Sequence, residues 1–181
     1  MPGNNKRAMI LEAAVHTVEV SGAAHLTIDA VAVAAGVSKG GLLYHFPSKQ
    51  ALLEGMLEYF LEQMNSRTAA YQASHPDDAN VALVARIIEE HDQKPAQRAM
   101  ARAILAAAAE DPDLLAPTRQ VVKLAFDEAA QGSTPPDMGW VLLLAVEGLR
   151  FLEVLKMLPL SRAERKHLHT TLLDLARSHA T

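Results

Sequence analysis

The sequence predicts an all-α fold, with an N-terminal three-helix domain joined to a larger helical domain and about nine helices in total. The chain of 181 residues is 50% hydrophobic but only 4% aromatic, and alanine and leucine are plentiful. That composition favours helix over sheet. Apolar residues recur at the three- and four-residue spacing of helices, and no stretch shows the strict alternation of a half-buried strand.

The first expected helix carries Ile10, Ala14 and Val18 along one face and ends at Ser21-Gly22. Thr27 is expected to cap a second helix, because its hydroxyl can accept a hydrogen bond from a free amide of the first turn. Gly36 follows this helix and is expected to adopt the left-handed conformation that ends many helices. The predicted buried face of the second helix is Ile28, Val31, Ala32 and Ala35.

A short third helix is expected from Lys39 to His45, capped by Ser38 and ended at Pro47. Ser48 can cap a long fourth helix. The apolar positions of that helix are Leu52, Met56, Tyr59, Phe60 and Met64.

Five later helices are expected at 79–92, 96–109, 112–131, 135–158 and 162–179. Asp111 before Pro112, and Thr134 before Pro135, are typical of a capping residue followed by proline at a helix start. Ser161 and Glu164 form a capping-box pattern. Pro117 fits a helix only if it lies within the first turn, or if the helix begins later than residue 112.

The charge and composition of the chain limit the classes of protein to which it can belong. The net charge is −4, but residues 1–50 carry +1 and the remainder −5, so the N-terminal end is the part suited to meeting phosphates. The absence of cysteine excludes disulfides and thiolate metal sites and fits a reducing cytoplasm. The start of the chain lacks a signal-peptide pattern, and the apolar runs are too short to span a bilayer, so we expect no membrane association.

The third helix carries the most informative chemistry. Gly40 and Gly41 each cost roughly 1 kcal/mol relative to alanine in a helix, so their presence needs a reason. Small residues would let the helix backbone approach the major groove of DNA, while Lys39, Tyr44 and His45 reach phosphates or base edges. Free amides at the start of this helix, and at Ser48-Lys49 on the next, would suit phosphate groups.

From about residue 10 to 56 the sequence resembles the N-terminal domain of the TetR family of transcriptional regulators, including the run from Leu43 to Lys49 followed by Ala51-Leu52-Leu53. The resemblance implies a nine-helix fold, a two-fold dimer and recognition of double-stranded operator DNA by residues 38–45. It also implies phosphate contacts from Thr27, Tyr44 and Lys49. The candidate DNA-binding residues are Thr27, Ser38, Lys39, Gly40, Gly41, Leu42, Tyr44, His45 and Lys49. We therefore expect a DNA-binding domain at 1–50 and a ligand-sensing and dimerisation domain at 51–181.

Other interpretations of this segment remain open. The two short helices could be purely architectural, with Leu42, Leu43 and Phe46 in the core and Tyr44 as a packing residue. The stretch from Gly36 to Gly40 matches the G-x-S-x-G pattern of serine hydrolases, but that pattern requires a preceding strand, and an alanine-rich helical segment precedes Ser38. We therefore expect no catalytic residues and no enzyme.

The helix expected at 135–158 is apolar on most of its sides, so it must be buried against several neighbours. Together with the last helix, which carries Leu168, Leu172, Leu175 and Ala176, it could form a four-helix interface across a two-fold axis, as the family resemblance implies. A core helix of a monomer would show the same pattern.

A looser resemblance, through Glu147-Gly148-Leu149 and Pro159-Leu160-Ser161 followed by Arg165, links this region to a subgroup of the family that includes regulators of multidrug efflux. It implies a hydrophobic or cationic small-molecule effector. Glu147 could neutralise a cationic ligand or simply pair with Arg150. The candidate ligand-binding residues are Met64, Met100, Phe126, Trp140, Glu147 and Phe151, although methionines and aromatics at helical spacing are more often core residues.

We expect no cofactor and no metal, because the eight histidines lack ligand spacing and His167 and His169 fall on different helix faces. The sequence thus predicts a ligand-responsive transcriptional regulator that binds a palindromic operator as a dimer and is released by a small hydrophobic or cationic molecule. The family resemblance implies repression of an efflux or metabolic gene, although the residues themselves are equally compatible with activation. The alternatives are a helical enzyme or small-molecule carrier without DNA-binding activity, and an adaptor that uses the same helices on a protein partner.

Overall fold

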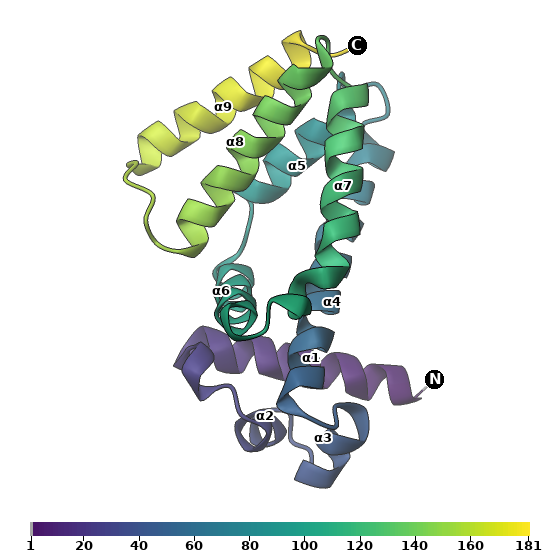
Figure 1. Ribbon diagram of the computed structural model, residues 1–181, viewed down its shortest axis with the longest axis vertical. Helices are drawn as coiled ribbons and strands as arrows, with labels where there is room; N and C mark the ends of the chain where they lie inside the picture. The colour runs from purple at the N-terminus through teal and green to yellow at the C-terminus, as the bar shows by residue number, and fades with distance from the viewer. Residues whose placement is uncertain (1) are drawn as a thin grey trace. The chain divides into compact units, whose positions relative to one another are not determined.

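The computed structural model describes residues 2–181, and within this range the chain forms nine α-helices and two 3-10 turns (Figure 1). The turns are Ala23–His25 and Pro112–Leu115. The helices are α1 Pro2–Ser21, α2 Ile28–Ala34, α3 Lys39–His45, α4 Lys49–Ser74, α5 Val81–His91, α6 Pro95–Glu110, α7 Ala116–Gln131, α8 Pro136–Val154 and α9 Arg162–Ser178. The prediction of an all-α fold is therefore confirmed.

The helices form two compact units. The N-terminal unit contains the chain up to residue 62 together with residues 94–116, and the C-terminal unit contains residues 63–93 and 117–181. Helix α4 begins in the first unit and ends in the second. Helix α6 belongs to the N-terminal unit, because its side chains pack against α1. A functional boundary at residue 50 is a different division and stays a prediction.

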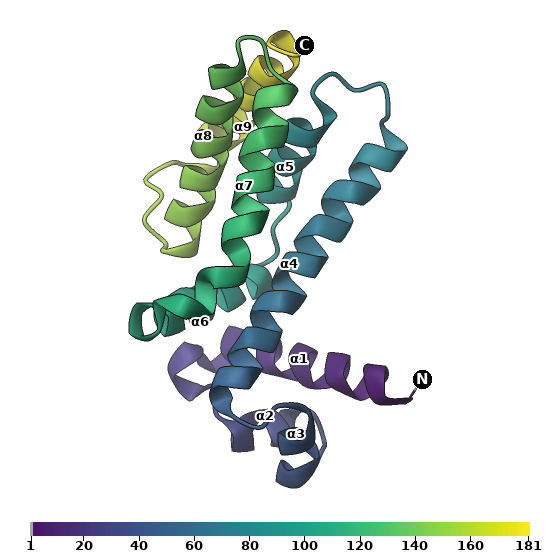
Figure 2. The ribbon, with the colours of Figure 1, turned by 45° about the vertical axis from the view of Figure 1, so that its right-hand side comes forward.

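In the N-terminal unit, α2 and α3 are two short helices joined by a tight turn, and they pack with α1 and the start of α4 (Figure 2). The predicted face of α1 is confirmed, because Ile10, Ala14 and Val18 are all buried. The other buried members of this core include Val31, Leu42, Leu52, Met56, Ala99, Met100 and Ile104. This apolar centre leaves the outer sides of α2 and α3 free.

In the C-terminal unit, α5 packs against α8 and α9, and α8 and α9 lie side by side (Figure 1). The spacing of the apolar residues on α5 and α8 puts one stripe of each helix toward this core, as a helical period requires. The buried residues are Leu83, Val84, Ile87, Ala125, Ala129, Leu142, Leu143, Val146, Leu149, Leu172 and Ala176.

Two helices end in the same left-handed motif. After α2, the amide of Gly36 donates to the carbonyl of Val33 at 3.1 Å, and Gly36 has a φ of +63°. After α8, Lys156 adopts a φ of +58° and donates to Glu153 at 3.0 Å. These bonds satisfy carbonyls that the helix leaves free at its end. The helix predicted at 135–158 therefore stops at Val154.

The segment predicted as one helix at 112–131 contains a break. Residues 112–115 form a 3-10 turn, in which the Asp111 carboxylate accepts a hydrogen bond from the Asp113 amide at 3.2 Å. Helix α7 then starts at Ala116, which places Pro117 in its first turn, where a missing amide hydrogen does no harm. The expected cap at Thr134 is wrong, because Pro135 precedes α8 as its N-cap and makes no side-chain capping bond.

Gly36→Ala is expected to destabilise the protein by about 1–2 kcal/mol, because a side chain disfavours the left-handed conformation of this position. Urea unfolding followed by circular dichroism would measure the loss. Gly40→Ala is the matched control, since Gly40 lies inside α3 without positive φ and a Cβ there meets nothing within 4 Å. An equal effect of the two substitutions would contradict the assigned turn conformation.

Candidate functional site

The surface of α3 exposes residue types that the fold itself does not need. Tyr44 is 86% exposed, and Lys39, Gly40 and Gly41 are exposed beside it. Leu42, in contrast, is fully buried and Phe46 nearly so. Leu42 was included among the candidate DNA-binding residues, but its side chain faces the core and cannot reach a ligand on the surface. The helix therefore has one face for packing and one face left to solvent.

Capping hydroxyls fix the starts of three helices around this surface. Thr27 accepts a hydrogen bond from the Ala30 amide at 3.1 Å, and Ser38 accepts one from the Gly41 amide at 3.0 Å. Ser48 accepts one from the Ala51 amide at 3.0 Å at the start of α4. The remaining amides of the first turn of this 26-residue helix have no intrahelical acceptor, so they favour an anion near Lys49.

Gly40 lies in α3 at a position where a side chain would have open space. A Cβ built on Gly40 would meet no atom within 4 Å. On Gly41 it would approach the Ser38 hydroxyl to 3.2 Å. Glycine at position 40 therefore lowers helix stability without relieving any contact inside the chain. No contact among the described residues compensates for that cost.

Few basic side chains lie on this face, and one of them already forms an ion pair. Lys39 pairs with Asp29 of α2 at 3.0 Å, with both side chains largely exposed. A surface pair of this kind contributes little to stability and is easily exchanged for another partner. Lys6 of α1 lines the same hollow as Ser38, Tyr44 and His45, a concavity of about 590 Å³.

Close packing behind α3 sets the position of its outer face. The Phe46 ring lies where a Cβ on Gly55 would come within 2.5 Å, so glycine at this position of α4 admits the ring. The Arg7 guanidinium lies 5.4 Å from the centre of the Phe46 ring and pairs with Glu58 at 2.8 Å. These contacts hold the end of α3 against α1 and α4.

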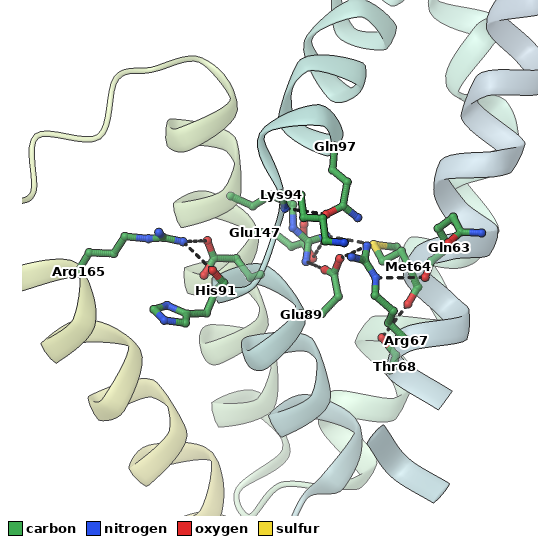
Figure 3. Close-up of polar contacts among 12 residues, drawn as sticks. Gln63, Met64, Arg67, Thr68, Glu89, His91, Lys94, Gln97, Glu147 and Arg165 are labelled. Atoms are coloured by element: carbon green, nitrogen blue, oxygen red, sulfur yellow. Dashed lines mark hydrogen bonds and ion pairs between the residues drawn. The ribbon is translucent and has the colours of Figure 1, made fainter. Parts of the chain in front are cut away.

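The C-terminal unit contains a buried carboxylate held by two guanidinium groups. Glu89 of α5 accepts hydrogen bonds from Arg67 of α4 at 2.9 Å and from Arg150 of α8 at 2.8 Å. Figure 3 shows Arg67 and Met64 directed toward Glu89. Arg150 also contacts the Met64 sulfur at 3.2 Å and lies 3.5 Å from Glu147. Charge-assisted bonds of this kind are the strong ones in a protein interior.

A second polar group lies one residue further along α5. Glu90 is buried, and its carboxylate lies 3.6 Å from Arg165 of α9. Arg165 also contacts Glu153 of α8. It donates a hydrogen bond to the His91 carbonyl at 3.3 Å (Figure 3). Burial raises the pKa of Glu90 to about 7, and the nearby charge of Glu153 adds to the effect.

Helix α8 also carries apolar side chains on its outer surface. Trp140, Val141, Leu144 and Phe151 are each about half exposed. With Gly148, Leu152 and Leu155 they recur at helical spacing along one face, which we call the exposed α8 stripe. A Cβ on Gly148 would meet nothing within 4 Å. Large exposed apolar patches are rare on monomeric proteins.

Family models match both parts of the chain. The model of bacterial regulatory proteins of the tetR family matches residues 10–56, and the model of the tetracyclin repressor-like C-terminal domain matches residues 82–177. The second match alone covers more than half of the sequence. The chain belongs to the TetR family of transcriptional regulators. It is therefore a DNA-binding regulator and not an enzyme.

Other proteins resemble the chain in part of its sequence or in its fold. The chain is 39% identical over 64 residues to the nucleoid occlusion factor SlmA of Marinomonas sp., which is 35% of this chain and 32% of that protein. The chain thus matches about a third of the length of this curated relative. A TetR transcription regulator from Haloarcula marismortui has a TM-score of 0.77 at 17% identity, covering 98% and 100% of the two chains. The multidrug binding protein EbrR in complex with imidazole has a TM-score of 0.67 at 20% identity, covering 92% and 94%.

No helix within residues 2–181 is long and apolar enough to cross a membrane. The described side chains also bring no three His, Asp or Glu residues together as ligands for a metal ion.

The structure separates the candidate ligand-binding residues of this TetR protein. Met100 lies in the core of the N-terminal unit, whereas Met64 and Phe126 lie in the C-terminal unit. Trp140 and Phe151 belong to the exposed α8 stripe, and Glu147 lies within reach of Arg150, the simpler of its two expected roles. These residues are not brought together around one described cavity.

Sequence reasoning overlooked Glu89 and Glu90. A signal was present, because Leu83, Val84 and Ile87 define the buried face of α5, and the same helical period continues to Glu90. Charged residues on the apolar side of a helix indicate buried partners. Lys6 was also overlooked as a neighbour of Tyr44, since sequence alone does not show that α1 borders the same hollow.

Glu89→Gln is expected to lower the free energy of unfolding by about 3 kcal/mol, because it removes the carboxylate that balances two partly buried guanidinium groups. Urea unfolding would measure the loss. Glu128→Gln is the matched control: Glu128 pairs with Arg86 at 3.3 Å but is 49% exposed, so the expected loss is below about 1 kcal/mol. Similar losses for both variants would show that the Glu89 cluster contributes no more than a surface pair.

Proposed function

We propose that the chain is a ligand-responsive repressor that binds a palindromic operator as a homodimer and is released by a small molecule. The observation that carries the proposal is the outer face of α3, where Lys39, Gly40, Gly41 and Tyr44 are exposed while Leu42 anchors the helix in the core. Such a helix is suited to the major groove, because small residues permit close approach and the larger ones can reach bases and phosphates.

The neighbouring helix starts support the assignment of phosphate contacts. Thr27, Ser38 and Lys49 are exposed at the beginnings of α2, α3 and α4. The free amides of α4 and the ammonium of Lys49 favour the same negative group. Lys39 would exchange its exposed partner Asp29 for a phosphate or a base edge. His45, half-buried beside Tyr44, completes the proposed set.

Dimerisation through α8 and α9 is proposed because the exposed α8 stripe has no partner within the described chain. One short recognition helix reads few bases, whereas two helices related by a two-fold axis read half-sites about 34–36 Å apart. A self-complementary apolar face is what a two-fold interface requires. Gly148, in the middle of the stripe, would allow two copies of α8 to approach closely.

The proposed effector is a hydrophobic or cationic molecule bound in the C-terminal unit. Glu147 is the acidic group proposed to meet a cation, because its side chain is 41% exposed beside Arg150, whereas Glu89 is already paired with two arginines. The similarity in fold to a multidrug binding protein is consistent with this class of ligand. A coupling of about 1–3 kcal/mol between the two sites would weaken operator binding roughly 5–150-fold. The target would be an efflux or metabolic gene, regulated in the cytoplasm.

The decisive experiment is fluorescence anisotropy of the purified protein with DNA upstream of its own gene, titrated against salt and against unrelated DNA of equal length. A preference of about a hundredfold or more, with affinity falling steeply as salt rises, would support a specific operator binder. Absence of any binding site in a genome-wide fragment selection with ligand-stripped protein would contradict the proposal.

Lys39→Ala is expected to weaken binding to all DNA and to reduce the slope of log affinity against log salt by about 1, because one phosphate contact is lost. Lys123→Ala is the matched control. Lys123 also pairs with an aspartate and is similarly exposed, but it lies on α7. Gly40→Ala should leave the protein at least as stable and still lower operator affinity about tenfold, since the added methyl group enters the groove. Unchanged affinity of both α3 variants would exclude this helix as the reading element.

Gly148→Arg is expected to convert a dimer into a monomer, because it places a charge in the middle of the exposed α8 stripe without a clash inside the protomer. Sedimentation equilibrium would measure the mass. Val122→Arg on α7 serves as the control, since Val122 is also about half exposed but lies outside the stripe. A dimer that survives Gly148→Arg, or a wild-type monomer, would refute the proposed interface.

A further inference from the structure

A hollow in the N-terminal unit lies between the start of α4 and the end of α6, and the segment that joins α1 to α2 borders it as well. We call it the α4–α6 hollow. Its volume is about 420 Å³, within the range of roughly 300–1,000 Å³ that is typical of small-molecule sites. It shares no lining residue with the hollow beside Tyr44.

The walls of the α4–α6 hollow are largely apolar. Leu26 and Leu53 line it and are buried in the core of the N-terminal unit. On α6, the lining residues Ala103, Ala106 and Ala107 follow one another at three- and four-residue spacing, so they share one face of the helix. Because an alanine side chain ends at Cβ, this face leaves the space in front of it open. The walls therefore suit an apolar ligand body.

The rim of the hollow carries charges of both signs. Lys49 begins α4, Glu110 ends α6, and Asp111 follows it. Within residues 2–181, neither Lys49 nor Glu110 takes part in an ion pair, and both side chains are exposed. Their charges are therefore available to a molecule that enters the hollow.

Asp111 also retains a negative charge that no cation balances. Its carboxylate accepts hydrogen bonds from the Gln50 side-chain amide at 2.9 Å and from the Asp113 backbone amide at 3.2 Å. Both donors are neutral, and they use two of the roughly four acceptor positions of a carboxylate. The bond from Gln50 also brings Asp111 beside the first turn of α4, in which Lys49 lies.

This distribution of charge selects the chemistry of a ligand. A molecule that carried only a positive charge would meet Lys49, and one that carried only a negative charge would meet Glu110 and Asp111. A like charge at close range, or a polar group removed from water without a partner, counts against binding. A molecule with an ammonium group, a carboxylate and an apolar body avoids both costs.

We propose that the α4–α6 hollow binds an apolar α-amino acid, whose ammonium group pairs with Glu110 and Asp111 and whose carboxylate pairs with Lys49. The side chain of the amino acid would lie against the alanines of α6. This site belongs to the N-terminal unit, so it is distinct from the effector site proposed in the C-terminal unit. Its occupation does not depend on the proposed function.

One consequence does rest on the proposed function, in which Lys49 contacts a DNA phosphate. A carboxylate bound to Lys49 competes with that phosphate, so the amino acid would weaken DNA binding. By thermodynamic reciprocity, DNA would weaken binding of the amino acid by the same factor.

Alanine-methyl NMR of the full chain without DNA tests the site directly. We expect L-leucine and L-phenylalanine to shift the ¹³C-methyl resonances of Ala103, Ala106 and Ala107 in a saturable manner, while that of Ala176, buried in the C-terminal unit, stays constant. Phenethylamine lacks the carboxylate and 3-phenylpropanoate lacks the ammonium group, so each should bind about fivefold more weakly than L-phenylalanine, as the loss of one solvent-accessible ion pair predicts. No saturable shift with either amino acid, or equal affinity for one of the two analogues, would overturn the proposal.

Two variants test the assigned contacts. Glu110→Gln should weaken binding of L-phenylalanine about fivefold and leave binding of 3-phenylpropanoate no weaker. Ala106→Leu should abolish binding of both amino acids, because the longer side chain occupies the hollow from an exposed position. Glu19→Gln is the matched control, since Glu19 is an exposed acid of α1 that does not line the hollow.

Wild-type affinity of Glu110→Gln for L-phenylalanine would refute the assigned ammonium contact and with it the proposal. The same titration separates this site from the proposed function. A chain that binds L-phenylalanine at these alanines but binds no DNA would refute the proposed function and support the site.

Discussion

The carboxylate of Glu89 has almost no contact with water, and guanidinium groups from two other helices balance its charge. Arg67 comes from α4 and Arg150 from α8, so three helices of the C-terminal unit meet at one ionic centre. Apolar packing is non-directional and tolerates small shifts, whereas a buried charge that loses its partners costs several kcal/mol. The Glu89 contacts therefore restrict how α4, α5 and α8 can be arranged. The neighbouring Glu90, Glu153 and Arg165 extend the same constraint to α9.

In the N-terminal unit, the fold and the proposed function depend on different residues. Its fold depends on buried apolar residues such as Leu42 and Phe46, and its proposed function depends on residues that contribute little to that fold. Gly40 is the clearest case, because the chain has open space where alanine would stabilise the helix. Thr27 and Ser38 cap helices with their hydroxyls and are also among the proposed DNA contacts. In the proposed function, stability and recognition would be carried by opposite faces of the same short helices.

Much of the fold was predictable because its signals are local. Capping residues at Thr27, Ser38, Ser48 and Ser161 marked helix starts, and Gly36 marked the turn before α3. The end of α8 was missed because Lys156 adopts a conformation that glycine usually provides. The candidate ligand-binding residues were harder to predict. Met100 belongs to the N-terminal unit because α6 packs against α1, and no local pattern records which helices meet.

The exposed α8 stripe makes the behaviour of the protein depend on its concentration. A protomer that leaves half of Trp140 and Phe151 in water gains stability from any copy that covers them, and this gain depends on concentration by mass action. Dilution would then act on the regulator much as an effector does, because it would reduce the fraction of chains that are dimeric. If the proposed dimer binds the operator, a change in expression of this gene would change operator occupancy more steeply than in proportion to the number of chains.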